Sequence, residues 1–126
     1  MRKMKICSIL AVAAAICIQS VSGQSYAAIN TALDWAAYDL YWFDVDLSYG
    51  DLNLAQGDLD WAVYDTNQAQ AEIDDALALG SRADLSHYQA EVNQDWIIID
   101  QDQADLNQAG DAAWWWDDWS FDWWWE

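Results

Sequence analysis

The chain has 126 residues, with 22 aspartates and glutamates, four lysines and arginines, 11 tryptophans and no proline. After residue 23, Arg82 alone among lysines and arginines stands against all 22 acids, which gives a formal charge of 1 minus 22, that is −21, with His87 neutral. Such a surface repels nucleic acid phosphates, which excludes nucleic acid as a partner, and it disfavours anionic membrane surfaces. It favours cationic proteins or peptides, divalent cations and neutral ligands.

The first 23 residues have the order of a secretory signal peptide. The positive segment MRKMK precedes an apolar run over residues 6–18 and a short polar stretch, and cleavage after either Gly23 or Ala27 fits the small residues there. The apolar run is shorter than the ~20 residues that span a bilayer. Both cysteines lie inside this segment, so the mature chain has no disulfide. We therefore predict a secreted or periplasmic protein.

A first helix is predicted from about Asn30 to Tyr49, with Gly50 as its stop and Thr31 and Asp34 as a capping pair at its start. Its apolar seam follows a 4-3-4-3-4 spacing over Ile29, Leu33, Ala36, Leu40, Phe43 and Leu47.

A second apolar stripe runs beside this seam and consists of Trp35, Tyr38, Trp42, Val45 and Tyr49. Two interpretations are open. The two stripes form one broad core face that neighbours bury on two sides, or the second stripe is a partly exposed aromatic ridge that binds a flat ligand or surface.

Two further helices are predicted. The second extends from Asp58 to Leu79 and ends at Gly80, with a face of Leu59, Val63, Thr66, Ile73 and Leu77. The third begins at Ser81 or Asp84 and extends to Ala109, with Gly110 as its stop. Ser81 and Asp84 resemble a second capping pair. Its face consists of Leu85, Tyr88, Val92, Trp96, Ile99 and Leu106.

An internal sequence repeat, which we call the echo, supports this scheme. Residues 33–39 (LDWAAYD) recur 26 positions later as residues 59–65 (LDWAVYD), with six of seven positions identical. With fewer than three good copies, a duplicated helix in one bundle is favoured over a solenoid. We predict an all-α fold, a small antiparallel three-helix bundle over residues 24–111, followed by a Trp-rich tail over 112–126 whose conformation the pattern leaves open.

The tail has three interpretations. It is a low-complexity end that packs partly on the bundle, a recognition segment with aromatic anchors, or an element that inserts at a membrane interface. Four acids in the tail oppose the third interpretation. The aromatic candidates for partner binding are Trp35, Tyr38, Trp42, Trp61, Trp114, Trp115, Trp116, Trp119, Phe121, Trp123, Trp124 and Trp125.

Residues for catalysis are scarce. The mature chain has one histidine, His87, and no cysteine or lysine, so we predict that the protein is not an enzyme and holds no zinc. Calcium, which takes oxygen ligands, is a weak alternative. Its candidate ligands alternate along two segments and include Asp44, Asp46, Asp100, Asp102 and Asp105.

The combined prediction is an exported, acidic, non-catalytic binding protein that uses the aromatic stripe and the Trp-rich tail to bind a cationic protein or peptide, or a neutral glycan. The alternatives are a calcium-linked buffering or assembly protein, a self-assembling surface or matrix component, and a chain without a defined activity.

Overall fold

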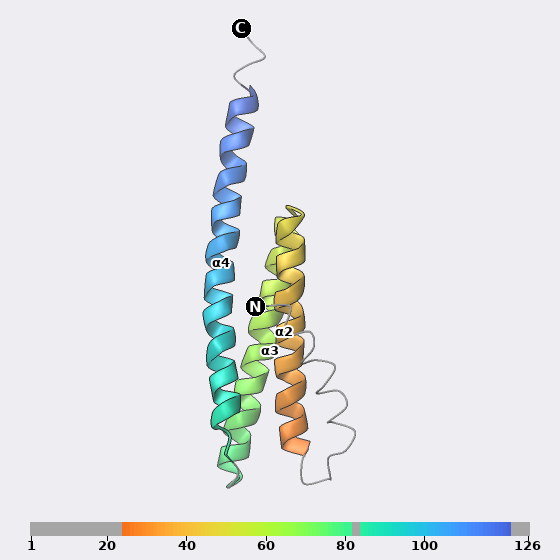
Figure 1. The fold of residues 1–126 in the computed structure, drawn as a ribbon, viewed down its shortest axis with the longest axis vertical. Coiled ribbons are helices and arrows are strands. Elements are labelled where there is room, and N and C mark those ends of the chain that lie inside the picture. Colours follow the sequence, from red (N-terminus) through yellow and green to blue (C-terminus); the bar gives the residue numbers. More distant parts are fainter. Residues whose placement is uncertain (1–23, 82–83, 122–126) are drawn as a thin grey trace.

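The computed structural model describes residues 24–81 and 84–121, with backbone only for Gln24, Ser25 and residues 114–121. This part forms the helices α2 (Gln24–Ser48), α3 (Leu52–Ala78) and α4 (Ser86–Phe121), and it contains no strand. The helices run alternately up and down the long axis (Figure 1). The all-α bundle predicted from the sequence is confirmed. The predicted signal peptide and residues 122–126 of the tail lie outside the described residues.

Both inter-helix turns depend on glycine. Gly50 and Gly80 have φ angles of 77° and 79°, which is the left-handed region that other L-residues rarely adopt. In each turn the glycine N–H donates to a carbonyl of the preceding helix, at 3.0 Å, with Leu47 and Leu77 as acceptors. The two glycines predicted to stop these helices are confirmed in that role.

Two glycine substitutions are expected to have opposite effects. At both Gly50 and Gly57 an added Cβ would meet no atom within 4 Å, so only the backbone decides the result. Gly50→Ala should cost about 1 kcal/mol because of its positive φ angle. Gly57→Ala, inside α3, should stabilise by about 0.5–1 kcal/mol because alanine favours a helix. Urea unfolding of both variants would check this, and two changes of the same sign would contradict it.

All three helices are longer than predicted. α2 begins at Gln24, so the Thr31–Asp34 capping pair is wrong: Thr31 lies inside the helix and its Oγ1 donates to the Ala27 carbonyl at 2.7 Å. α3 begins at Leu52, after Asp51, whose side chain accepts the Leu54 N–H at 3.1 Å. The early start of α3 buries Ala55 completely, so packing outweighs the helix-breaking tendency of Gly57.

The start and end of α4 also differ from the prediction. Asp84 Oδ1 accepts the Ser86 N–H at 2.9 Å. Because α4 begins at Ser86, Ser81 and Asp84 both lie before the helix, and the predicted capping pair is wrong. Ser81 is hydrogen bonded through Oγ to the Tyr26 hydroxyl at 3.0 Å. Gly110 lies inside α4, which continues to Phe121 and extends alone beyond the α2–α3 turn (Figure 1).

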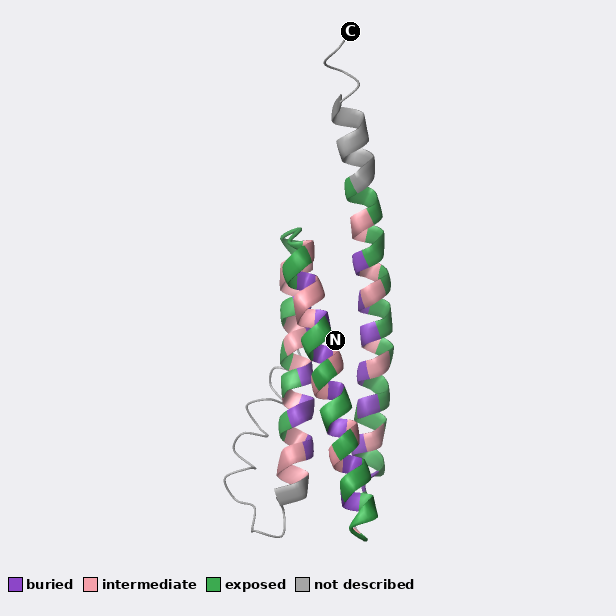
Figure 2. Cartoon of the chain, turned by 180° about the vertical axis from the view of Figure 1, so that it is seen from behind, coloured by how far each residue is buried: buried purple, intermediate pink, exposed green. Residues whose placement is uncertain are grey.

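The core follows a heptad pattern. Buried residues of α3 alternate at spacings of four and three, which gives the 3.5-residue period of helices that wrap around one another. Alanine occupies every second position of this seam, so α2 can approach closely. Figure 2 shows the buried positions as stripes along the helices. The α3 seam is Ala55, Leu59, Ala62, Thr66, Ala69, Ile73 and Ala76.

The predicted faces are largely confirmed. In α4, Tyr88, Val92, Ile99 and Leu106 are buried, as is Leu85 just before the helix. Trp96 is partly buried where it packs against both core clusters. Leu77 of α3 was wrongly assigned to the core, because it is 55% exposed. The sequence pattern also missed two acids in α4: Asp95 and Asp102 are both buried.

Glutamine pairs connect α3 and α4. The amides of Gln70 and Gln89 exchange hydrogen bonds of 3.0 and 2.7 Å. Those of Gln56 and Gln103 exchange weaker bonds of 3.4 and 3.3 Å. The two pairs lie 14 residues apart on each helix, which is two heptads, so both specify the same antiparallel register.

Candidate binding site

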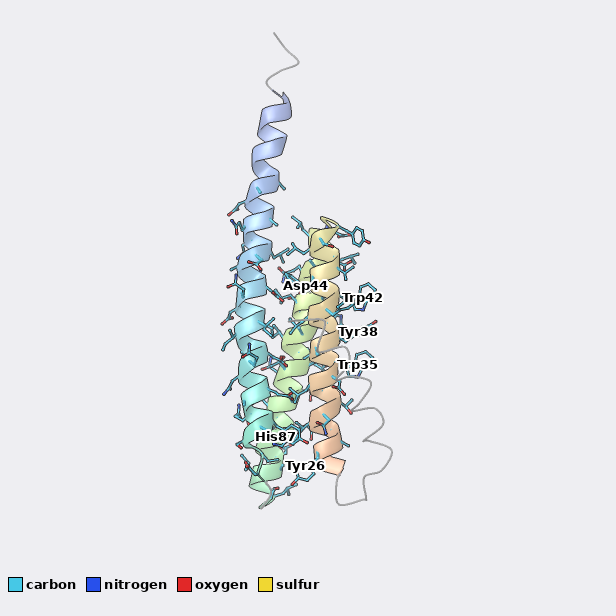
Figure 3. The ribbon with its side chains drawn as sticks, viewed as in Figure 1. Tyr26, Trp35, Tyr38, Trp42, Asp44 and His87 are labelled. Carbon is cyan, nitrogen blue, oxygen red and sulfur yellow. The ribbon has the colours of Figure 1, made fainter. Side chains whose placement is uncertain are left out.

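Aromatic side chains cover the outer side of α2. The first apolar seam of this helix is buried except for Leu47, which is partly buried, whereas Trp35, Tyr38 and Trp42 are 54%, 43% and 39% exposed. The Trp35 and Tyr38 rings make an edge contact with centroids 5.6 Å apart, and Tyr38 and Trp42 make another at 6.1 Å. These three side chains point away from α4 (Figure 3). The aromatic residues of the second stripe are therefore exposed rather than part of a broad core face, and their role in binding stays a prediction.

The same arrangement recurs on α3. Trp61 and Tyr64 are 60% and 53% exposed, and their rings make an edge contact at 5.7 Å with an interplanar angle of 85°. The equivalent Trp35–Tyr38 angle is 87°. The sequence echo is thus also a structural echo. We call Trp35, Tyr38, Trp42, Trp61 and Tyr64 the aromatic face.

A pocket of about 380 Å³ lies where the two copies meet, and its lining consists of Trp35, Asp39, Trp61 and Asp65. These are the third and seventh positions of the echo, taken once from each copy. Because α2 and α3 are antiparallel, the copies face one another with approximate twofold symmetry. We call this cavity the hairpin pocket.

Of the two carboxyls in the hairpin pocket, Asp39 has a raised pKa. Burial, a hydrogen bond to Asp65 and repulsion from Asp65 and Asp58 raise the pKa of Asp39 to about 7. One carboxyl can donate to another only when it is protonated. With both groups ionised, the buried Asp39 Oδ2 has no hydrogen-bond donor. Asp39 therefore exchanges its proton with solvent near neutral pH.

A second carboxyl pair lies closer to the α2–α3 turn, because Asp46 follows Asp39 by seven residues and Asp58 precedes Asp65 by seven residues. Burial, a hydrogen bond to Asp46 and repulsion from Asp46 raise the pKa of Asp58 to about 6. Closer to the other end of α2, burial and repulsion from Glu91 of α4 raise the pKa of Asp34 to about 6. Within residues 24–81 and 84–121 there is no lysine or arginine to neutralise these groups, and the single histidine, His87, is exposed.

The predicted aromatic candidates divide into two groups. Trp35 and Trp61 are brought together at the hairpin pocket, and Tyr38 and Trp42 extend the aromatic face along α2. Trp114, Trp115, Trp116, Trp119 and Phe121 belong to α4, but their side chains lie outside the described residues, as do Trp123, Trp124 and Trp125. The sequence analysis did not single out Asp39 and Asp65, although they close the two copies of the echo.

The calcium candidates lie on helices rather than in loops. Asp44 and Asp46 belong to α2, and Asp100, Asp102 and Asp105 belong to α4. Alternate residues of a helix point to different sides, so neither run can wrap around one ion. No group of three or more potential metal ligands occurs among the described residues.

Comparison with protein-family models, with curated proteins and with solved structures finds no match to this chain. Among the described helices, none is long and apolar enough to cross a membrane.

Proposed function

We propose that this is an exported, non-catalytic binding protein that recognises a positively charged protein or peptide through the aromatic face, with the Trp-rich C-terminal segment as a second contact region. The observation that carries the proposal is the exposure of five neighbouring aromatic side chains beside carboxyls that have no lysine or arginine near them in the described part. Isolated exposed aromatics are ordinary, but a contiguous aromatic patch marks an interaction surface.

Charge and aromatic area contribute differently. The acids attract a cationic partner over a distance and speed association, an effect that salt screens. The indole and phenol rings supply contact area and a negative π face, on which lysine and arginine side chains can stack. A neutral glycan could use the rings but would gain nothing from the charge.

Calorimetric titration of the exported protein with oligolysine, and in parallel with a neutral oligosaccharide, tests this proposal. We expect oligolysine to bind and salt to weaken that binding. Trp42→Ala should weaken binding about tenfold, as expected for loss of a stacked aromatic contact. Leu79→Ala is the matched control, because Leu79 is 85% exposed but lies at the C-terminal end of α3, away from the α2–α3 turn near which Trp42 lies. Binding of the oligosaccharide alone, or equal losses in both variants, would contradict the proposal.

A further inference from the structure

We propose that the hairpin pocket is a binding site for an N-methylated ammonium group, with its charge beside Asp39 and Asp65 and its methyl groups between Trp35 and Trp61. This proposal deepens the proposed function and rests on it, because it names the chemical group that the aromatic face would recognise. The group can belong to a small molecule such as choline or to a trimethyllysine of a partner protein.

The lining of the pocket selects the class of ligand. Two indoles and two carboxyls, with no basic residue among the described side chains, make a site that is both aromatic and negative. Aromatic rings around a cation are the usual recognition mode for quaternary ammonium groups. The pocket is open to solvent and has a volume of about 380 Å³, so a ligand can enter it from outside.

Methylation matters because of hydration. A primary ammonium is a compact, strongly hydrated charge that must give up water to approach an indole. An N-methylated ammonium keeps the charge but presents methyl groups, which both exposed indoles can cover. Trp35 and Trp61 are more than half exposed and so lose water-accessible apolar area when a ligand enters.

The raised pKa of Asp39 makes binding depend on pH. The groups that act on Asp39 are Asp65 and Asp58, both from α3, and their repulsion helps to keep a proton on Asp39. From α4, Glu91 acts on Asp34. A bound cation favours the ionised form of Asp39, so it should lower the pKa of Asp39, and its affinity should rise as pH increases through about 7.

The test is a calorimetric titration of the exported protein with choline and with 3,3-dimethyl-1-butanol, its neutral carbon analogue, at constant ionic strength. We expect choline alone to bind, and to bind more tightly at pH 8 than at pH 5.5. A peptide carrying trimethyllysine and the same peptide with acetyllysine form a second arm. Tighter binding of the trimethyllysine peptide than of choline would assign the group to a partner protein, and the reverse would assign it to a small molecule.

Variants test the position of the site. Trp61→Ala should weaken choline binding about tenfold, and Asp39→Asn should weaken it and flatten its pH dependence. Leu79→Ala and Asp75→Asn are the matched controls, since neither residue lines the pocket or belongs to the aromatic face. Circular dichroism would confirm that each variant is folded.

The two proposals fail in different ways. If oligolysine binds but choline does not, or if choline and its neutral analogue bind equally, the ammonium site is wrong while the proposed function stands. If choline binds with the expected variant effects but oligolysine does not, the ammonium site stands and recognition of a cationic protein or peptide is wrong. Choline binding that Trp61→Ala leaves unchanged would also overturn the site.

Discussion

Phe43→Ala is expected to lower the free energy of unfolding by about 3–5 kcal/mol, whereas Trp42→Ala should lower it by about 1 kcal/mol or less. The two residues are neighbours in α2, but Phe43 is fully buried and Trp42 is 39% exposed. Phe43 packs in the core cluster near the α2–α3 turn, together with Leu40, Leu59 and Ile99. Its truncation leaves a cavity that these side chains can fill only in part.

Urea unfolding followed by far-ultraviolet circular dichroism would measure both variants against the parent protein. A lower midpoint with an unchanged slope would assign the effect of Phe43→Ala to the folded state. Equal losses for the two variants would mean that both stripes of α2 are buried, which would remove the basis of the aromatic face as a binding surface.

The 4-3 spacing of apolar residues was sufficient to predict three helices and most of their core positions, because residues at this spacing share one face of a helix but not one face of a strand. Helix boundaries were less predictable. Gly57 and Gly110 look like stops in the sequence, but one glycine costs a helix only about 1 kcal/mol. In α3, the longer helix buries Ala55, and this burial offsets the cost of Gly57.

The candidate site could be predicted only in part. The aromatic stripe was visible in the sequence, but whether a neighbour covers it depends on how many helices surround α2. The pairing of Asp39 with Asp65 depends on the register between α2 and α3, which single-helix periodicity does not contain. The burial of Asp95 and Asp102 was hard to predict for the same reason, because an acid at a seam position looks like a solvent-exposed residue until its neighbours are known.

A fold more stable in mild acid than at pH 8 is the second expected result. The pKa values of Asp34, Asp39 and Asp58 are raised from 3.8 to about 6, 7 and 6. A raised pKa means that the folded state holds the proton more tightly than the unfolded chain does. The stability contributed by these protons is therefore complete below about pH 4 and is lost as pH rises through 6 to 7.

The size of the effect must allow for solvent, because all three carboxyls are partly exposed. If the proton on each group contributes about 1 kcal/mol to the free energy of unfolding after screening, the melting temperature should fall by roughly 10 °C between pH 4.5 and pH 8. Repulsion among the many other acids acts in the same direction. Thermal unfolding across this pH range at fixed salt would show the fall, and a melting temperature that rises with pH would contradict it.

Asparagine variants separate the buried pairs from the general charge. In Asp39→Asn and Asp58→Asn the amide can donate to the partner carboxylate at every pH, so each variant should melt several degrees higher than the parent at pH 8 and change less with pH. Asp75→Asn removes the same charge from an exposed position of α3. If Asp75→Asn raised the melting temperature as much as Asp39→Asn, overall repulsion rather than the proton on Asp39 would control stability. A larger effect at Asp39 would link the stability of the bundle to the same carboxyl pair that the proposed ligand contacts, and a bound cation would then protect the fold most at high pH.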